Sequence, residues 1–324
     1  MFRFERLIIG TLLLLTTGVG ISLVVYPVSH QIRVPQASFV AAIDHLQPAN
    51  SIKQTRRLRI IQTSKVTAGY LYNTFSRISY DLGNIRNGDS SVPRLFVKSL
   101  PADMRAISVI KKRKELFFQA ILPLILRVND QIMVDRKRIQ SLKLASGKKS
   151  KLSAEDRLWL AFMEEKYKVR NSNIKELLTR VDTIPPSLAL AQAAEESGWG
   201  TSRFVKEGNA LFGQWTAGTD QGLVPDAREK NRDYLVKSFS SLQDGVTAYA
   251  HNLNTHLAYR KFRKNRAEMR TALRELNGIA LSKHLLSYSK RGAGYVRSIV
   301  AIIRSNKLGK LDGAVLTDRQ KKTY

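Results

Sequence analysis

The sequence has two adjacent carboxylates, Glu195 and Glu196, between an alanine-rich run and a Gly-Trp-Gly turn. Ala189, Ala193 and Glu196 follow the i, i+4, i+7 spacing of one helical face, so small side chains surround the Glu196 carboxyl. Beside the Trp199 indole, this carboxyl would be poorly solvated when charged, which raises its pKa. Such a group can donate a proton to a glycosidic oxygen near neutral pH. The alternative, common for a Glu-Glu pair, is a solvated helix face.

The element that must position Glu196 is a helix with signals at both ends. Pro185 and Pro186 suit its entrance, because proline there loses no needed N–H and has a helical φ. Residues 187–195 are good helix formers, and Gly198 is a natural stop.

Glu196 begins the run ESGWG, which follows LAQA (190–193) and precedes NALFG (209–213). This combination resembles the signature of the endo-β-N-acetylglucosaminidase family, which includes flagellar and autolysin muramidase domains. The resemblance implies a mostly helical, lysozyme-like α+β fold with a small β-lobe. It also implies peptidoglycan glycan strands as the substrate, Glu196 as the general acid, and substrate contacts from Gln192 and Asn209.

A second block, within residues 92–136, resembles the bacterial Bax proteins of the Gram-negative envelope. It comprises VP at 92–93, LP at 100–101, KELFF at 114–118, LPL at 122–124, Asn129 and DR at 135–136. With the first block, the resemblance covers about residues 92 to 305.

Hydrolysis needs a second group besides a proton donor, either a second carboxylate or the 2-acetamido group of the substrate. Relatives carry an acid in the β-lobe shortly before a strand, and Glu229 is the nearest match here, although its surroundings lack their threonine-acid-tyrosine pattern. The alternative is that Glu229 and its acidic neighbours are exposed partners of nearby basic residues.

Aromatic residues are the other candidates for sugar contact. Tyr288 and Tyr295 resemble tyrosines that line the sugar cleft in relatives, although both could be packing residues. We interpret Trp215 as a sugar contact, and Trp199 and Phe212 as structural.

The charge and the residue composition limit the kinds of ligand and cofactor that we expect. The 324 residues include 54 Lys and Arg but only 26 Asp and Glu, which gives a net charge of +28. This charge implies an anionic partner. No nucleic-acid motif is recognisable, so nucleic acid is not expected. The chain has no Cys, and its five His lack the i, i+4 spacing of helical zinc ligands, so neither a metal nor another cofactor is expected.

The N-terminus contains an apolar run, residues 7–28, preceded by Arg3 and Arg6. It is long enough to cross a bilayer, and the basic flank predicts a cytoplasmic N-terminus. We expect a single-pass inner-membrane protein with its domain in the periplasm. The alternative is a cleaved signal peptide, with residues 18–20 as the small-residue site and a secreted periplasmic product.

The expected organisation has five parts. They are a membrane anchor or signal (1–28), a spacer (29–91), a helical Bax-type region (92–180), a glucosaminidase-like catalytic domain (181–310) and a tail (311–324). Within them we predict a long helix over 104–144, broken or bent near Pro123, a loop over 143–151, and a short strand over 234–239.

These observations favour a peptidoglycan hydrolase that cleaves the β-1,4 bond after N-acetylglucosamine. A lytic transglycosylase is the close alternative, but those enzymes usually have a Gly-Leu-Met-Gln block where this chain has LFGQ at 211–214. A non-catalytic wall-binding scaffold is the third possibility.

Overall fold

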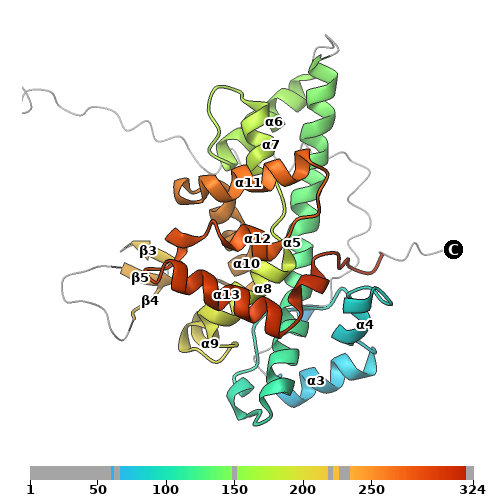
Figure 1. The fold of residues 1–324 in the computed structure, drawn as a ribbon, viewed down its shortest axis with the longest axis vertical. Helices are drawn as coiled ribbons and strands as arrows, with labels where there is room; N and C mark the ends of the chain where they lie inside the picture. Colours follow the sequence, from blue (N-terminus) through green and yellow to red (C-terminus); the bar gives the residue numbers. More distant parts are fainter. Residues whose placement is uncertain (1–59, 62–65, 148–151, 218–221, 226–233, 319–324) are drawn as a thin grey trace, which may run out of the picture. The chain divides into compact units, whose positions relative to one another are not determined.

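Helices dominate the architecture (Figure 1). The computed structural model describes residues 60–61, 66–147, 152–217, 222–225 and 234–318, so the predicted N-terminal anchor and Glu229 lie outside it. The helices of this part of the chain are α3 (Ala68–Arg77), α4 (Leu82–Asn87), α5 (Ile110–Gly147), α6 (Ala154–Lys166), α7 (Ile174–Arg180), α8 (Pro186–Ser197), α9 (Arg203–Gly208), α10 (Leu242–Thr255), α11 (Arg260–Thr271), α12 (Gly278–Ser282) and α13 (Ala293–Ser305). The 3-10 turns are η2 (Met104–Ala106), η3 (Leu257–Tyr259), η4 (Leu286–Tyr288) and η5 (Leu308–Leu311).

The long helix α5 was predicted to break or bend near Pro123. The structure instead has one continuous helix of 38 residues through Pro123, and it includes residues 143–147 of the predicted loop. Leu122 and Leu124 beside the proline are fully buried, so packing holds the turn that lacks one backbone hydrogen bond. Among the described residues, only this helix is long and apolar enough for a membrane span, but 72% of its most apolar window is buried inside the molecule.

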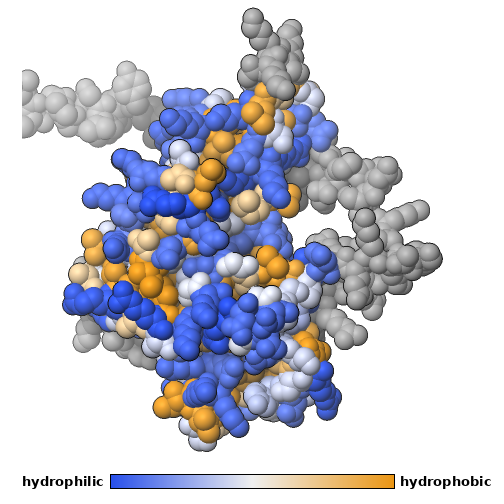
Figure 2. All heavy atoms as spheres, turned by 45° about the vertical axis from the view of Figure 1, so that its right-hand side comes forward, coloured by the Kyte–Doolittle hydropathy of each residue, from blue (hydrophilic) through white to orange (hydrophobic). Residues whose placement is uncertain are grey.

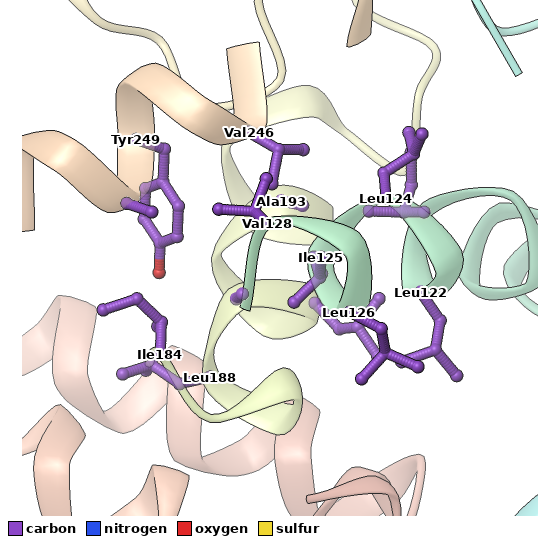
Figure 3. Packing of buried hydrophobic residues seen from close by; sticks show 14 of the residues in the cluster. Leu122, Leu124, Ile125, Leu126, Val128, Ile184, Leu188, Ala193, Val246 and Tyr249 are labelled. Carbon is purple, nitrogen blue, oxygen red and sulfur yellow. The ribbon is translucent and has the colours of Figure 1, made fainter. Parts of the chain in front are cut away.

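The core around the Glu196 helix is formed by α5, α8 and α10. Their apolar side chains meet in Figure 3, with Val128 from α5, Ala193 from α8 and Val246 from α10. Helix α8 is buried on nearly every side, and its small alanines allow the neighbouring helices to approach closely. The face of the molecule shown in Figure 2 is mainly hydrophilic, with smaller groups of apolar side chains between the polar ones.

A small antiparallel sheet stands beside the helices (Figure 1). Its strands are β3 (Trp215–Ala217), β4 (Gly222–Leu223) and β5 (Tyr234–Lys237), in the order β3-β5-β4. Trp215 pairs with Val236 in register. The strand predicted over 234–239 is therefore confirmed, two residues shorter than expected.

Part of the predicted spacer is folded. Helices α3 and α4 bury Leu71, Phe75, Leu82 and Ile85, which join the main core. Strands β1 (Ile60–Ile61) and β2 (Phe96–Val97), which precede and follow these two helices in the chain, pair in parallel. At least this portion of residues 29–91 therefore contributes to the core.

The C-terminal segment contacts two distant parts of the chain. The Asp312 carboxylate accepts hydrogen bonds from the backbone N–H (2.8 Å) and hydroxyl (2.8 Å) of Ser187, near the start of α8. Pro185, the N-cap residue of α8, offers no side-chain cap of its own, so Asp312 supplies it. Leu316 forms a parallel bridge with Val92, which joins the N-terminal part of the fold to the same segment.

A buried ion cluster holds the segment that leads into α8. Asp182 is 1% exposed and accepts a bidentate pair of hydrogen bonds from Arg270, at 3.1 and 2.9 Å. Burial opposes ionisation of Asp182, but Arg266, Arg270 and Arg136 outweigh it and hold its pKa below the usual value. The ion cluster therefore fixes the approach to α8 with its charges compensated.

Candidate active site

Glu196 lies in the last turn of α8, where the sequence placed it. The helix begins at Pro186 and ends before Gly198, which adopts the left-handed conformation (φ 55°) and donates its N–H to Ala194 O. The predictions of the proline entrance and the glycine stop are both confirmed. A carboxylate at a helix C-terminus faces the negative end of the helix dipole, which disfavours its charged form.

The turn after Glu196 contains three successive left-handed residues, Gly198, Trp199 and Gly200, with φ of 55°, 60° and 75°. Ser197 stabilises it, because its hydroxyl donates to Ala193 O and accepts from Gly200 N–H at 2.9 Å. A Cβ on Gly200 would lie 2.5 Å from Leu100 Cδ1, so this position has room only for glycine. The turn therefore depends on residue types that the motif supplies.

The expected contact between the Trp199 indole and Glu196 is wrong. The ring packs edge-on against Phe117 and Phe118 of α5, with centroids 6.1 and 5.4 Å away, and Lys114 Nζ lies 4.3 Å from its centroid. Trp199 thus anchors the turn to α5, and it is not among the residues that line the cavity at Glu196. Its structural role was predicted correctly.

Glu196 lines a cavity of about 880 Å³ that lies between the helices and the sheet. Among the described residues that line it, Glu196 is the only carboxylate. The other lining residues are Lys168, Phe212, Gly213, Gln214, Trp215, Thr216, Lys237, Ala248, His251, Asn252, Thr255, His256, Tyr259, Tyr288, Ser289 and Lys290.

The surroundings of Glu196 favour its protonated form. Burial is the largest effect and raises the pKa of the carboxyl, and the negative charge of Glu195 adds to the increase. A hydrogen bond from Tyr295 and the charge of Arg291 act in the opposite direction without cancelling it. Arg291 itself pairs with Glu195 at 2.5 Å. The source of desolvation differs from the predicted indole, but the direction of the shift is the same.

A buried chain of hydrogen bonds lies behind Glu196. Tyr249 Oη donates to Gln192 Oε1 at 2.7 Å, and Gln192 Nε2 donates to Tyr295 Oη at 2.9 Å. Because Tyr295 accepts from the amide, its own hydrogen is available for the Glu196 carboxyl, with which it is hydrogen-bonded. The chain orients one donor toward the candidate acid.

Aromatic rings form the wall of the cavity. Phe212 stacks on Tyr249 with centroids 3.8 Å apart, and Tyr288 stacks on Tyr295 with centroids 5.4 Å apart. The Tyr288 hydroxyl donates to Phe212 O at 3.3 Å, which ties the two stacks together. Gly213 has a φ of 56°, and a Cβ there would lie 3.6 Å from Glu196 Oε2. The wall thus brings backbone close to the carboxyl.

The structure divides the predicted substrate contacts into two groups. Trp215, 61% exposed, and Tyr288 line the cavity with Glu196. Gln192 and Tyr295 are buried, 0% and 1% exposed, and lie behind the carboxyl as its support. Their buried positions do not offer the direct sugar contacts that were predicted.

Asn209 also has a different position from the predicted substrate contact. It ends α9 in the left-handed conformation (φ 51°), and its Nδ2 donates to Phe239 O at 3.0 Å. It does not line the cavity. Asparagine tolerates this backbone conformation, which explains its presence at the helix end.

Several lining residues were not singled out as site residues from the sequence. Lys168 follows α6, while His251, His256 and Tyr259 lie on or just after α10. His251 Nε2 donates to Lys166 O at 2.7 Å, and His256 Nδ1 accepts from Ala258 N–H at 3.2 Å. The one available signal was that His251 and His256 lie only five residues apart in the sequence.

Comparisons with known proteins agree with the two sequence blocks. The family described as mannosyl-glycoprotein endo-beta-N-acetylglucosaminidase matches residues 172–308. Protein bax of Escherichia coli (strain K12) is 35% identical over 215 residues, which are 64% of this chain and 75% of that protein. The catalytic domain of the autolysin Auto from Listeria monocytogenes aligns with 53% of this chain and 96% of its own, at 17% identity and a TM-score of 0.32.

The extent of the match to the Escherichia coli protein and the glucosaminidase match over α7 to α13 point to the same assignment. The chain belongs to the Bax-like family within the glucosaminidase superfamily.

Proposed function

We propose that this protein is a peptidoglycan hydrolase that cleaves the β-1,4 bond after N-acetylglucosamine, with Glu196 as the general acid. The supporting observation is the position of Glu196, which is the only carboxylate among the described residues lining a cavity of about 880 Å³. Burial raises its pKa, as a proton donor near neutral pH requires. The glucosaminidase match includes this residue.

In the proposed mechanism, protonated Glu196 gives its proton to the glycosidic oxygen while the bond to the anomeric carbon breaks, and water, with the help of a second group, then adds to that carbon. Tyr295 then stabilises the carboxylate that remains, because its hydrogen bond favours the charged form. Trp215 and Tyr288 would hold the sugar rings against the wall.

The second group is either Glu229 or the 2-acetamido group of the substrate. Glu229 lies outside the described residues, and no second carboxylate lines the described part of the cavity. In this proposal the cavity is the cleft of a lysozyme-like fold, and the sheet β3-β5-β4 is its β-lobe.

Mass spectrometry of the fragments released from purified peptidoglycan tests the function. We expect reducing N-acetylglucosamine ends from the wild type and a loss of about 10²–10⁴-fold in rate with Glu196→Gln. Glu195→Gln is the matched control, because it makes the same change one residue earlier, where the carboxylate pairs with Arg291. It should retain most of the activity.

Two results would replace this proposal. Release of 1,6-anhydro ends would identify a lytic transglycosylase, in which the muramic 6-hydroxyl attacks in place of water. Binding without release by well-folded wild type would identify a wall-binding scaffold.

The proposed substrate lies outside the cytoplasm, so we also propose that residues 7–28 anchor the chain in the inner membrane with the catalytic part in the periplasm. A reporter enzyme that is active only after export, fused behind Tyr324, tests this placement. An inactive but intact fusion would contradict it.

A further inference from the structure

Positively charged side chains outnumber negatively charged ones among the described residues that line the cavity at Glu196. Lys168, Lys237 and Lys290 line it, against the single carboxylate Glu196 among its described residues. A cleft with one sign of charge concentrates ligands of the opposite sign. With a net charge of +28, however, lysines are common on this protein, so their presence alone decides little.

Lys168 differs from an ordinary surface lysine in its backbone. It follows the C-cap residue Tyr167 of α6 and has a φ of 56°. Its N–H donates a hydrogen bond to Glu165 O at 3.0 Å, and the N–H of Val169 donates one to Glu164 O at 2.8 Å. This pair of hydrogen bonds ends many helices. Glycine adopts this conformation at the least cost, whereas lysine does so under strain. Lys307 has the same conformation away from the cavity, so the strain alone does not mark a site. At Lys168 the strain coincides with a position in the cavity lining.

The turn that holds Lys168 is fixed to the cavity wall. His251, which lines the cavity, donates from Nε2 to Lys166 O at 2.7 Å. Arg180 donates to Tyr167 O at 3.0 Å, and the buried Tyr167 ring lies 5.8 Å from the His251 ring. The backbone of Lys168 is therefore held in place while its side chain is exposed at the cavity.

Lys168 also comes from outside the glucosaminidase match, which begins at residue 172. The helical region before the match therefore contributes a charge directly to the candidate active site. Its contribution to the molecule therefore extends beyond supporting the fold.

We propose that Lys168 binds a carboxylate carried by the glycan in the cavity at Glu196. The site then favours strands with acidic substituents over neutral sugar chains. In peptidoglycan this carboxylate has two sources, the peptide stem and the lactyl group of a muramic acid without a stem. The inference rests on the proposed function, because it concerns the substrate of the same cavity.

Calorimetric binding to the full-length protein, made inactive by Glu196→Gln, tests the proposal. The probes are three soluble peptidoglycan tetrasaccharides: with peptide stems, without stems but with free lactyl carboxylates, and without stems with those carboxylates converted to methylamides. We expect Lys168→Gly to raise the Kd of at least one carboxylate-bearing form by about fivefold at low salt, as for an exposed ion pair. The Kd of the methylamide should not change.

The same variant separates loss of binding from loss of folding. Glycine relieves the strain at φ 56°, so the melting temperature of Lys168→Gly should equal or exceed that of its parent. Lys307→Gly is the matched control, since Lys307 is also exposed, has a φ of 52° and does not line the cavity. It removes the same charge and should leave all three Kd values unchanged.

Each outcome has one meaning. An effect on the stem-bearing form alone identifies the stem as the source, and an effect on the stem-free form identifies the lactyl group. If Lys168→Gly changes all three Kd values equally, or none, the carboxylate contact is refuted while the proposed function stands. If the parent binds no fragment and the active wild type releases none, the proposed function fails and this inference fails with it.

Discussion

Replacing Gly200 by alanine tests how the turn after Glu196 is held together. Gly200 has a φ of 75°, and a Cβ there would lie 2.5 Å from Leu100 Cδ1 and 3.1 Å from Phe117 Cδ2. Leu100 is 5% exposed and Phe117 0%, so neither can move aside without disturbing the core. The substitution therefore adds backbone strain and overpacking at the same site.

The expected cost follows from three contributions. The left-handed backbone costs alanine about 1–2 kcal/mol. Overpacking adds about 1–3 kcal/mol. The smaller entropy of the unfolded chain returns about 0.4–1 kcal/mol. The free energy of unfolding should thus fall by about 3 kcal/mol, which lowers the melting temperature by roughly 6–10 °C in a protein of this size.

Urea and thermal unfolding measure this loss, with two other glycines as controls. Gly88 has a φ of 82° with nothing within 4 Å of an added Cβ, so Gly88→Ala carries the backbone strain alone. Gly309 has open space and no left-handed φ, so Gly309→Ala should be neutral or slightly stabilising. If Gly200→Ala costs no more than Gly88→Ala, the packing of this turn against α5 is not as tight as we infer.

Two further predictions concern ionisation. Tyr295→Phe keeps the ring stack on Tyr288 but removes the hydrogen bond that lowers the pKa of Glu196. The alkaline limb of the pH–activity profile should therefore move to higher pH. An unshifted profile would show that Tyr295 does not influence the ionisation of Glu196. Burial raises the pKa of Asp312 to about 6. The folded state therefore binds the proton more tightly, and stability declines as pH rises from about 4 to 6. In urea unfolding, the advantage of wild type over Asp312→Asn should shrink across that window, and a constant difference would contradict the shift.

The features predicted correctly from the sequence are those fixed by near neighbours. The proline entrance of α8 and the left-handed Gly198 act within one or two turns of the helix, so residue type alone indicates them. The family followed from two blocks, each made of short runs that lie close together in the chain.

The features that were missed depend on residues far apart in the chain. Trp199 turns toward α5 because Phe117 and Phe118 offer it a surface, which no local pattern states. Gln192 was taken for a sugar contact, but its amide is satisfied by two tyrosines from α10 and α13. Pro123 did not break α5, since burial of its neighbours outweighs a local preference.

The hydrogen bonds from Ser187 to Asp312 join the start of α8 to a residue that is synthesised much later. The chain leaves the ribosome N-terminus first, and Asp312 follows Ser187 by 125 residues. Until then, the helix that carries Glu196 lacks the carboxylate at its start, and Val92 lacks its partner Leu316. The fully capped form of α8 therefore becomes available only after Asp312 has been synthesised.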